Sequence, residues 1–177
     1  TWTQKLIIRR STVNNSSAVA ILKDKYSNAD SLVFVKDFTP SPHPLNANSS
    51  YEGQLVFVGY GVDIPGGYSD YKGIDVKGKI VVVISGAPDG LHSTTTAHLS
   101  NAGSKAKTVF EKGAAGVIAI NAAARPSTNM NPNIQNNITV NAEKTIAFGR
   151  GFVGNMKIVL SGTPVLLRRL FMNSGKN

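Results

Sequence analysis

A run of five β-branched residues, Ile80 to Ile84, restricts the fold of this chain more than any other feature. A Lys-Gly turn precedes the run, and the turn-forming residues 85–88 follow it. A short, unbroken apolar run between turns is typical of a strand that is buried on both faces. The sequence therefore predicts a strand at the centre of a sheet over residues 80–84.

The hydrophobic period changes after residue 100, and the new spacing predicts a helix. Four apolar residues fall on one helical face: Ala102, Ala106, Val109 and Phe110. Ser100 or Asn101 can cap the start of this helix, and Gly113 can end it. A second apolar run, 116–120, follows at once. This order predicts that 80–84 and 116–120 are parallel neighbours joined by a right-handed crossover.

The rest of the chain is predicted to be rich in strands. Residues 5–9 and 18–22, separated by a turn-rich linker, predict a hairpin or meander. Further strands are expected over 32–35, 55–60, 145–148 and 156–160, with loops over 87–97 and 121–137. Thr163 followed by Pro164 predicts a helix start, with Gly175 as the stop. The total is about nine strands and two helices, which is a mixed, strand-rich α/β class.

Carboxylates mark the segment that leads into the central strand. Asp70 and Asp75 are spaced among tyrosines and glycines: Tyr68, Tyr71, Gly73 and Gly78. Short carboxylate side chains hydrogen-bond to nearby backbone amides and so favour turns. We therefore expect a loop that is held by these carboxylates and feeds the strand.

Three blocks, in this order along the chain, resemble a known family. They are Leu55 to Gly61, Tyr68 to Lys79, and Glu111 to Ile120. Their sequences resemble those of the protease-associated (PA) domain, and more narrowly those of the PA domain inserted in zinc aminopeptidases of the M28 family. The likeness covers residues 30–121 best and implies a single PA domain over 1–177. It also implies the family's fold, a swivelling β/β/α domain in which an open β-barrel or sandwich is flanked by about two helices.

The C-terminal part departs from this family pattern. In the family, a helix like the one expected at 163–172 is usually followed by further strands that return to the sheet and then to the peptidase. In this sequence only a few residues follow. We expect either that the barrel is closed differently or that the chain is a piece of a larger peptidase.

Composition excludes several other kinds of protein. The chain has 177 residues, no cysteine and a formal net charge of +9. Without cysteine there is no disulfide, no thiolate nucleophile and no cysteine-bound zinc. The basic residues are scattered and lack the interleaved aromatics of a platform for single strands, so no specific nucleic-acid partner is expected. No apolar run approaches the length of a membrane span.

The sequence carries no recognisable catalytic motif. His43, His92 and His98 do not form a His-Glu-x-x-His arrangement and are not paired with carboxylates at ligand spacing. No Gly-x-Ser-x-Gly elbow occurs. The glycines of 149–154 spell a dinucleotide fingerprint, but a predicted strand follows them instead of the required helix. We therefore expect no catalytic residue, no metal site and no cofactor in this chain.

The resemblance implies a non-catalytic accessory domain of an exported M28-type zinc aminopeptidase. Such a domain modulates substrate access or makes protein contacts. Zinc is then expected only in a separate peptidase domain of the same parent chain. That peptidase domain is the first expected partner, and a peptide or protein substrate is the second. The family also implies an extracellular, periplasmic or cell-surface location.

Binding residues are expected on the long polar loops, because loops on a rigid sheet commonly carry function. These loops are 39–50, 63–67, 87–97 and 122–137. The candidate binding residues are His43, Tyr68, Tyr71 and His92, although for Tyr71 a place in the core is favoured. The alternative function is a stand-alone module of a receptor or surface protein that binds a peptide or a glycan.

Overall fold

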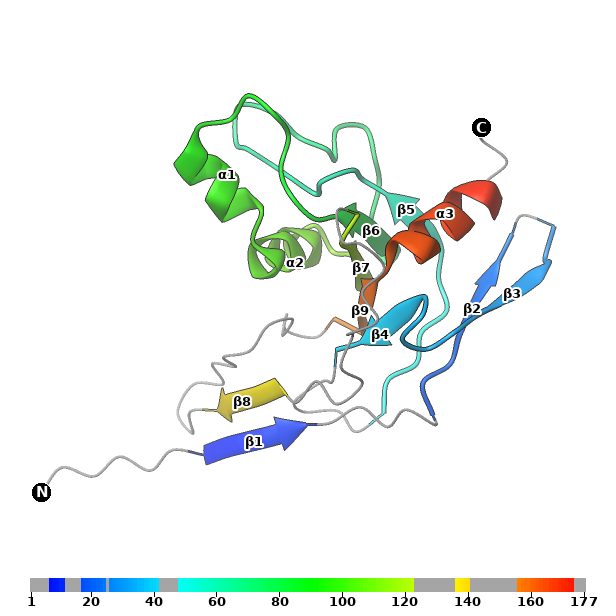
Figure 1. Cartoon of the computed structure of the whole chain (residues 1–177). Coiled ribbons are helices and arrows are strands. Elements are labelled where there is room, and N and C mark those ends of the chain that lie inside the picture. Colours follow the sequence, from blue (N-terminus) through cyan, green and yellow to red (C-terminus); the bar gives the residue numbers. More distant parts are fainter. Residues whose placement is uncertain are drawn as a thin grey trace, which may run out of the picture.

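A five-stranded sheet forms the centre of the fold (Figure 1). The computed structural model describes residues 7–11, 17–24, 26–41, 48–122, 136–140 and 156–173. The strands of the sheet, in spatial order, are β4 (Phe38–Pro40), β9 (Ile158–Gly162), β7 (Gly116–Ile120), β6 (Ile80–Ile84) and β5 (Leu55–Phe57). All neighbours are parallel except β4, which is antiparallel to β9. The mixed α/β class is confirmed, and within the described residues the sheet is open rather than closed into a barrel.

The predicted central strand and its crossover partner are confirmed. Strand β6 pairs in parallel with β7 along its whole length, from Ile80 opposite Gly116 to Ile84 opposite Ile120. Val81 and Val83 belong to the core cluster on one face of the sheet, and Val82 belongs to the cluster on the other face. The run is apolar at every position because helices and loops cover both faces.

Separate helices cover the two faces of the sheet. Helix α2 (Ala102–Glu111) contributes Ala106 and Val109 to the cluster that contains Val81 and Val83. Helix α3 (Pro164–Asn173) contributes Leu166 to the cluster on the opposite face. The two helices predicted from the hydrophobic spacing are therefore confirmed, and each one shields a different side of β6.

The ends of α2 follow the predicted capping pattern. Asn101 is the N-cap, and its Oδ1 atom accepts hydrogen bonds from the amides of Gly103 at 2.8 Å and Ser104 at 3.3 Å. Gly113 lies just after the helix with φ +79°, a left-handed conformation that glycine adopts without steric cost. The chain can therefore reverse sharply and enter β7.

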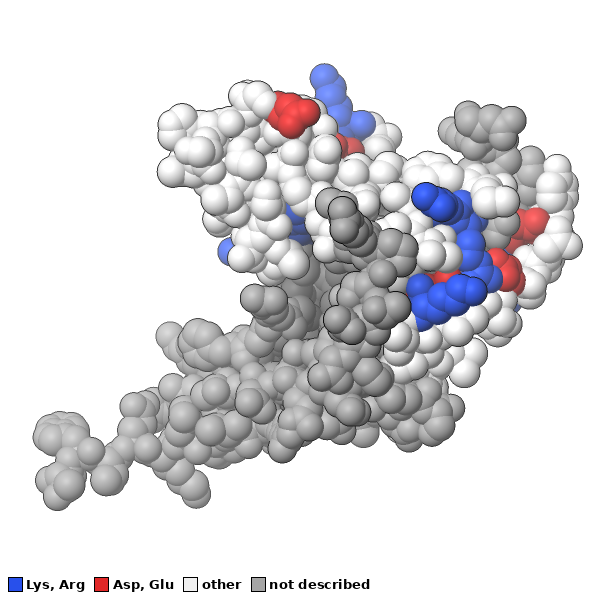
Figure 2. All heavy atoms as spheres, viewed as in Figure 1, with Lys and Arg blue, Asp and Glu red and all other residues white. Residues whose placement is uncertain are grey.

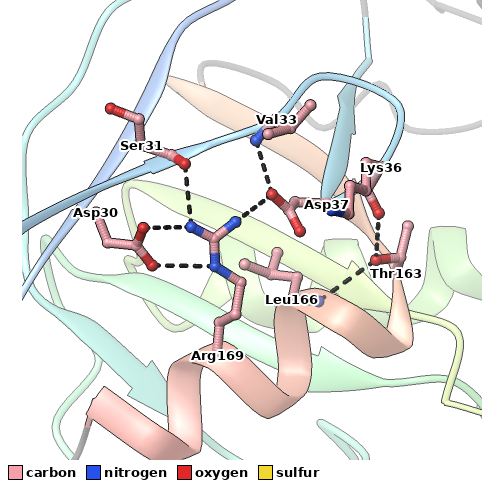
Figure 3. A network of polar contacts seen from close by, with 8 residues as sticks. All are labelled: Asp30, Ser31, Val33, Lys36, Asp37, Thr163, Leu166 and Arg169. Atoms are coloured by element: carbon pink, nitrogen blue, oxygen red, sulfur yellow. Dashed lines mark hydrogen bonds and ion pairs between the residues drawn. The ribbon is translucent and has the colours of Figure 1, made fainter.

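A partly buried ion-pair network fixes helix α3 to the edge of the sheet (Figure 3). Arg169 on α3 pairs through Nε and Nη2 with the two carboxylate oxygens of Asp30 and through Nη1 with Asp37. Asp37 is fully buried, and its Oδ2 also accepts a 2.7 Å hydrogen bond from the amide of Val33. At the helix start, the Thr163 hydroxyl donates to the carbonyl oxygen of Lys36 at 2.8 Å. Charge and capping together hold α3 against the segment before β4.

The predicted pairing of the first two strands is wrong. Strand β1 (Ile7–Ser11) pairs with β8 (Asn136–Val140), and β2 (Ala20–Lys23) forms a hairpin with β3 (Ala29–Leu32). The turn between β2 and β3 is stabilised by Asp24, whose carboxylate accepts hydrogen bonds from the amides of Tyr26 and Asn28. This local turn makes the β2–β3 pairing the shorter connection. It also places β3 a few residues before the strand that was expected over 32–35.

Helix α1 (Ser93–Leu99) replaces part of the loop that was expected over 87–97. None of its residues is buried, so it lacks the apolar stripe by which helices are recognised in a sequence. Strand β8 similarly begins inside the loop expected over 121–137. The strand expected over 145–148, the glycines of 149–154 and the helix stop at Gly175 lie outside the described residues.

The prediction of a carboxylate-held loop before the central strand is confirmed. The Asp70 carboxylate accepts a 2.8 Å hydrogen bond from the amide of Val62 and a 2.5 Å bond from the Tyr68 hydroxyl. Asp75 accepts a 3.0 Å bond from the amide of Lys77. These contacts hold the segment between β5 and β6 in a compact shape.

Candidate functional site

A cleft of about 600 Å³ lies between the segment 61–65 and the helices α1 and α2. It combines two of the loops singled out in the sequence, because 63–65 forms part of one wall and 94–95 part of the other. The cleft lies beyond the carboxyl ends of the parallel strands β5 and β6, where open α/β sheets commonly place their ligand sites. Its position makes it the candidate site of the described residues.

The first wall is one strand of a short β-hairpin. Asp63 and Ser69 form an antiparallel bridge, with hydrogen bonds from Ile64 to Tyr68 at 2.8 Å and from Asp70 to Val62 at 2.9 Å. The carboxylate of Asp70 closes the base of this hairpin. The wall is therefore held by backbone and side-chain hydrogen bonds together.

An ion pair ties this hairpin to the end of α2. Lys112 Nζ lies 2.5 Å from the Asp63 carboxylate and also stands 4.8 Å from the centre of the Tyr71 ring. The hydrogen bond from Lys112, supported by Ser69, lowers the pKa of the Asp63 carboxyl below its usual range. Asp63 therefore remains ionised and engaged at neutral pH, and it is not available as a proton donor.

Lys105 braces the base of the cleft. Its Nζ donates hydrogen bonds to the carbonyl oxygens of Tyr60 at 2.6 Å, Ile84 at 2.8 Å and Gly86 at 2.5 Å. Only 4% of this lysine is exposed. One ammonium group thus joins α2 to the two loops that leave the ends of β5 and β6.

The electrostatic environment of Lys105 is unusual for a lysine. Burial lowers its pKa from 10.5 to about 8, and the more distant negative charge of Asp70 acts in the opposite direction. The amine is also 5.5 Å from the centre of the Tyr60 ring, a favourable place for a cation. Because all three ammonium protons point to carbonyl oxygens, the charge supports the backbone rather than facing a ligand.

The second wall carries hydroxyl groups and one imidazole. Helix α1 contributes Thr94, Thr95 and His98, and helix α2 contributes Ser104 and Thr108. Thr94 lies 2.9 Å from Nδ1 of His92, and Thr108 donates to the carbonyl oxygen of Ser104. Within the described residues, no hydrogen bond engages the hydroxyls of Thr95 and Ser104 or the ring of His98. These three groups are free to bind a partner.

The residues proposed from the sequence do not line this cleft. Tyr68 is exposed on the hairpin, and its hydrogen bond to Asp70 raises the pKa of its phenol. Tyr71 is buried, as the core alternative required, and burial raises the pKa of its phenol. His92 is the exposed N-cap of α1 and lies beside the cleft. His43 lies outside the described residues.

The structural role of Lys105 was not predicted from the sequence, although its position on an apolar helical face indicated that its charge is unusually placed. Ala102, Lys105, Ala106 and Val109 follow the i, i+3, i+4, i+7 spacing of one helical face. A lysine on an apolar stripe must either extend to solvent or find partners inside. Its three acceptors come from loops far away along the chain, and helical spacing alone does not reveal them.

Positive charge is not concentrated at the cleft. On the face shown in Figure 2, Lys and Arg gather over α3 with Asp and Glu beside them, while uncharged residues cover α1. Arg169 is already paired with Asp30 and Asp37. In the cleft itself, Lys105 is engaged by carbonyl oxygens, and Lys107 lies 3.7 Å from the carboxylate of Glu111. The arrangement does not resemble an anion-binding surface.

The described residues also contain no constellation for metal chemistry. Among them, no three histidine and carboxylate side chains come together as metal ligands would. No helix in this part of the chain has the length and apolarity needed to cross a bilayer. The cleft presents main-chain groups, hydroxyls, the imidazole of His98, the side chains of Lys107 and Glu111, and apolar side chains.

Comparison with known families adds one finding. The family described as the PA domain matches residues 43–149, which is more than half of the chain. The matched region contains β5, β6 and β7, the helices α1 and α2, and both walls of the cleft. No curated protein matches the chain.

Proposed function

Because this chain belongs to the PA domain family, we propose that it is the non-catalytic accessory domain of an exported M28-type zinc aminopeptidase. In this role it modulates substrate access to the peptidase or makes protein contacts for it. Zinc belongs, in this proposal, to a separate peptidase domain of the same parent chain. Membership of the family makes the chain a protease-associated module. The identification of its parent as an M28 aminopeptidase goes beyond this membership and is part of the proposal.

One observation supports a contact role most directly. The cleft's most buried charges are already used inside the domain, since Asp63 pairs with Lys112 and Lys105 is held by carbonyl oxygens. The groups left over are hydroxyls, an imidazole, apolar side chains and the exposed surface pair of Lys107 and Glu111. Such a surface can bind another polypeptide, but it has no activated nucleophile or ordered acid and base.

The purified chain is expected to show no aminopeptidase activity. Chromogenic amino-acid anilides should remain intact at neutral pH, with and without added zinc, because the described residues bring no metal ligands together. The measurement is release of the chromophore, and heat-denatured protein is the control. Turnover above that control would contradict the non-catalytic role.

The M28 parent is tested by the coding DNA on either side of the codons for Thr1 and Asn177. We expect an open reading frame that continues into a segment with the histidine and carboxylate motifs of a two-zinc peptidase. Flanking sequence that encodes a membrane-spanning segment and no peptidase motifs would overturn this proposal. It would favour the stand-alone binding module instead.

A further inference from the structure

We propose that the cleft binds an extended peptide segment of a partner by main-chain hydrogen bonds to Asp63. This inference rests on the proposed contact function of the domain and specifies the site and the ligand class. The occupant is a polypeptide strand that lies between the hairpin wall and the helices α1 and α2.

The main chain of Asp63 is unpaired among the described residues. In the bridge between Asp63 and Ser69, the hydrogen bonds are made by the residues before and after the pair, Ile64 with Tyr68 and Asp70 with Val62. In this type of antiparallel pair, the amide and carbonyl of the opposed residues point away from the partner strand. Asp63 therefore directs one donor and one acceptor to the outer edge of the hairpin.

That outer edge faces the cleft. Residues 61–65 line the cleft, whereas the second strand of the hairpin, which contains Ser69, does not. The first strand thus stands between the cleft and the second strand. A peptide in the cleft can continue the hairpin as a third strand, which is the general mode of β-strand addition.

Side chains on the opposite wall can form hydrogen bonds with the main-chain groups on the other edge of such a peptide. Thr95 and Ser104 are half-buried, and their hydroxyls have no hydrogen-bond partner in the described part of the chain. A hydroxyl can both donate and accept, so it can pair with a peptide amide or a carbonyl. His98 adds a third polar group on the same wall. A bound strand would then be hydrogen-bonded on both edges.

Apolar side chains in the cleft favour a peptide with an apolar residue. Ile64, Pro65 and Leu99 contribute to the lining. No phenylalanine, tyrosine or tryptophan is among the described residues that line the cleft, so a sugar would find no large flat ring on which to stack. The volume of about 600 Å³ lies within the usual range of ligand pockets. A short peptide segment therefore matches the lining better than a glycan.

The test is a two-dimensional ¹⁵N–¹H NMR titration of the whole chain with blocked pentapeptides. The probes are acetyl-Ala-Ala-X-Ala-Ala-amides with Leu, Phe, Ser, Lys or Glu at X, added to about 10 mM, which reveals even weak binding. We expect the Leu peptide to shift the amide signals of Asp63, Ile64, Thr95 and Ser104. Absence of shifts with all five peptides, or shifts confined to other regions, would overturn the inference.

A methylated probe separates strand pairing from simple apolar contact. The Leu peptide with all internal amides N-methylated keeps its side chains but cannot donate hydrogen bonds from its main chain. We expect its affinity to fall about tenfold or more, because it loses the bond to the Asp63 carbonyl and one to a hydroxyl of the opposite wall, and two such bonds are worth roughly that factor. Equal binding of the methylated peptide would contradict pairing with Asp63.

A matched pair of variants on α2 locates the site on the protein. Ser104→Trp fills the cleft and should abolish the shifts, whereas Ala102→Trp, on an exposed position outside the lining, should leave them unchanged. Signal dispersion in the free spectra shows whether each variant is folded. Failure of peptide binding would leave the M28 parent untouched, because that proposal is tested by the flanking DNA.

Discussion

Replacing Lys105 with methionine is expected to lower the free energy of unfolding by about 3 kcal/mol. Methionine is close to lysine in length but cannot donate to the carbonyl oxygens of Tyr60, Ile84 and Gly86. Each shielded carbonyl that loses its donor costs about 1–3 kcal/mol. Relief of the buried charge offsets part of this loss. Urea denaturation followed by circular dichroism measures the difference.

Lys107→Met is the matched control for this substitution. Lys107 lies two residues further along the same helix, is exposed, and makes only a 3.7 Å surface ion pair with Glu111. Its replacement should change stability by less than about 0.5 kcal/mol. Equal effects of the two variants would show that Lys105 does not brace the loops.

The effect of Lys105→Met should grow as the pH rises. The pKa of Lys105 is about 8 in the folded protein, whereas a lysine in the unfolded chain titrates near its ordinary value of 10.5. Between these two values the unfolded state binds more protons, so the stability of the wild type rises with pH in that window. The variant lacks this contribution. The difference in free energy of unfolding between the wild type and the variant should therefore be larger at pH 10 than at pH 7. A smaller difference at pH 10 would contradict the lowered pKa.

Local patterns in the sequence were sufficient to predict the strands and the helix at the centre of the fold. The apolar run of β6, the amphipathic spacing of α2 and the run of β7 lie within about forty residues, and each has one obvious period. Their parallel pairing then follows from the short crossover. The pairing of β1 with β8 joins segments more than a hundred residues apart, and no local pattern specifies such a contact.

The candidate site was less predictable than the sheet. Its walls come from loops that were singled out as long and polar, but α1 carries no apolar stripe and was missed as a helix. Tyr68 and Tyr71 were candidate binding residues because they are tyrosines near polar loops. Tyr71 is a core residue, and Tyr68 hydrogen-bonds to Asp70 at the base of the hairpin. The unpaired backbone of Asp63 depends on the register of a single bridge. Register is a property of the fold, so side-chain type could not reveal it.

The second large effect is expected at the network between α3 and the sheet edge, where Arg169→Met should strongly destabilise the protein. Asp37 is fully buried, and its Oδ1 atom has no hydrogen-bond partner in the described residues. Without Arg169, its Oδ2 would keep only the amide of Val33. A buried charge that loses its partner typically costs about 3–5 kcal/mol. Thermal and urea unfolding should both report the loss.

A double-mutant cycle shows whether the buried charge of Asp37 is the reason that Arg169→Met destabilises the protein. Asp37→Asn removes the charge and leaves a side-chain oxygen that can still accept from Val33, so Arg169→Met should cost much less in that background than in the wild type. Arg168→Met is the control, because Arg168 is the exposed neighbour on the same helix. If Arg169→Met costs the same with Asn as with Asp at position 37, then Asp30 and Ser31 account for the role of Arg169 and the charge of Asp37 does not. A strong coupling would instead establish that α3 is held in place because a buried carboxylate requires its guanidinium.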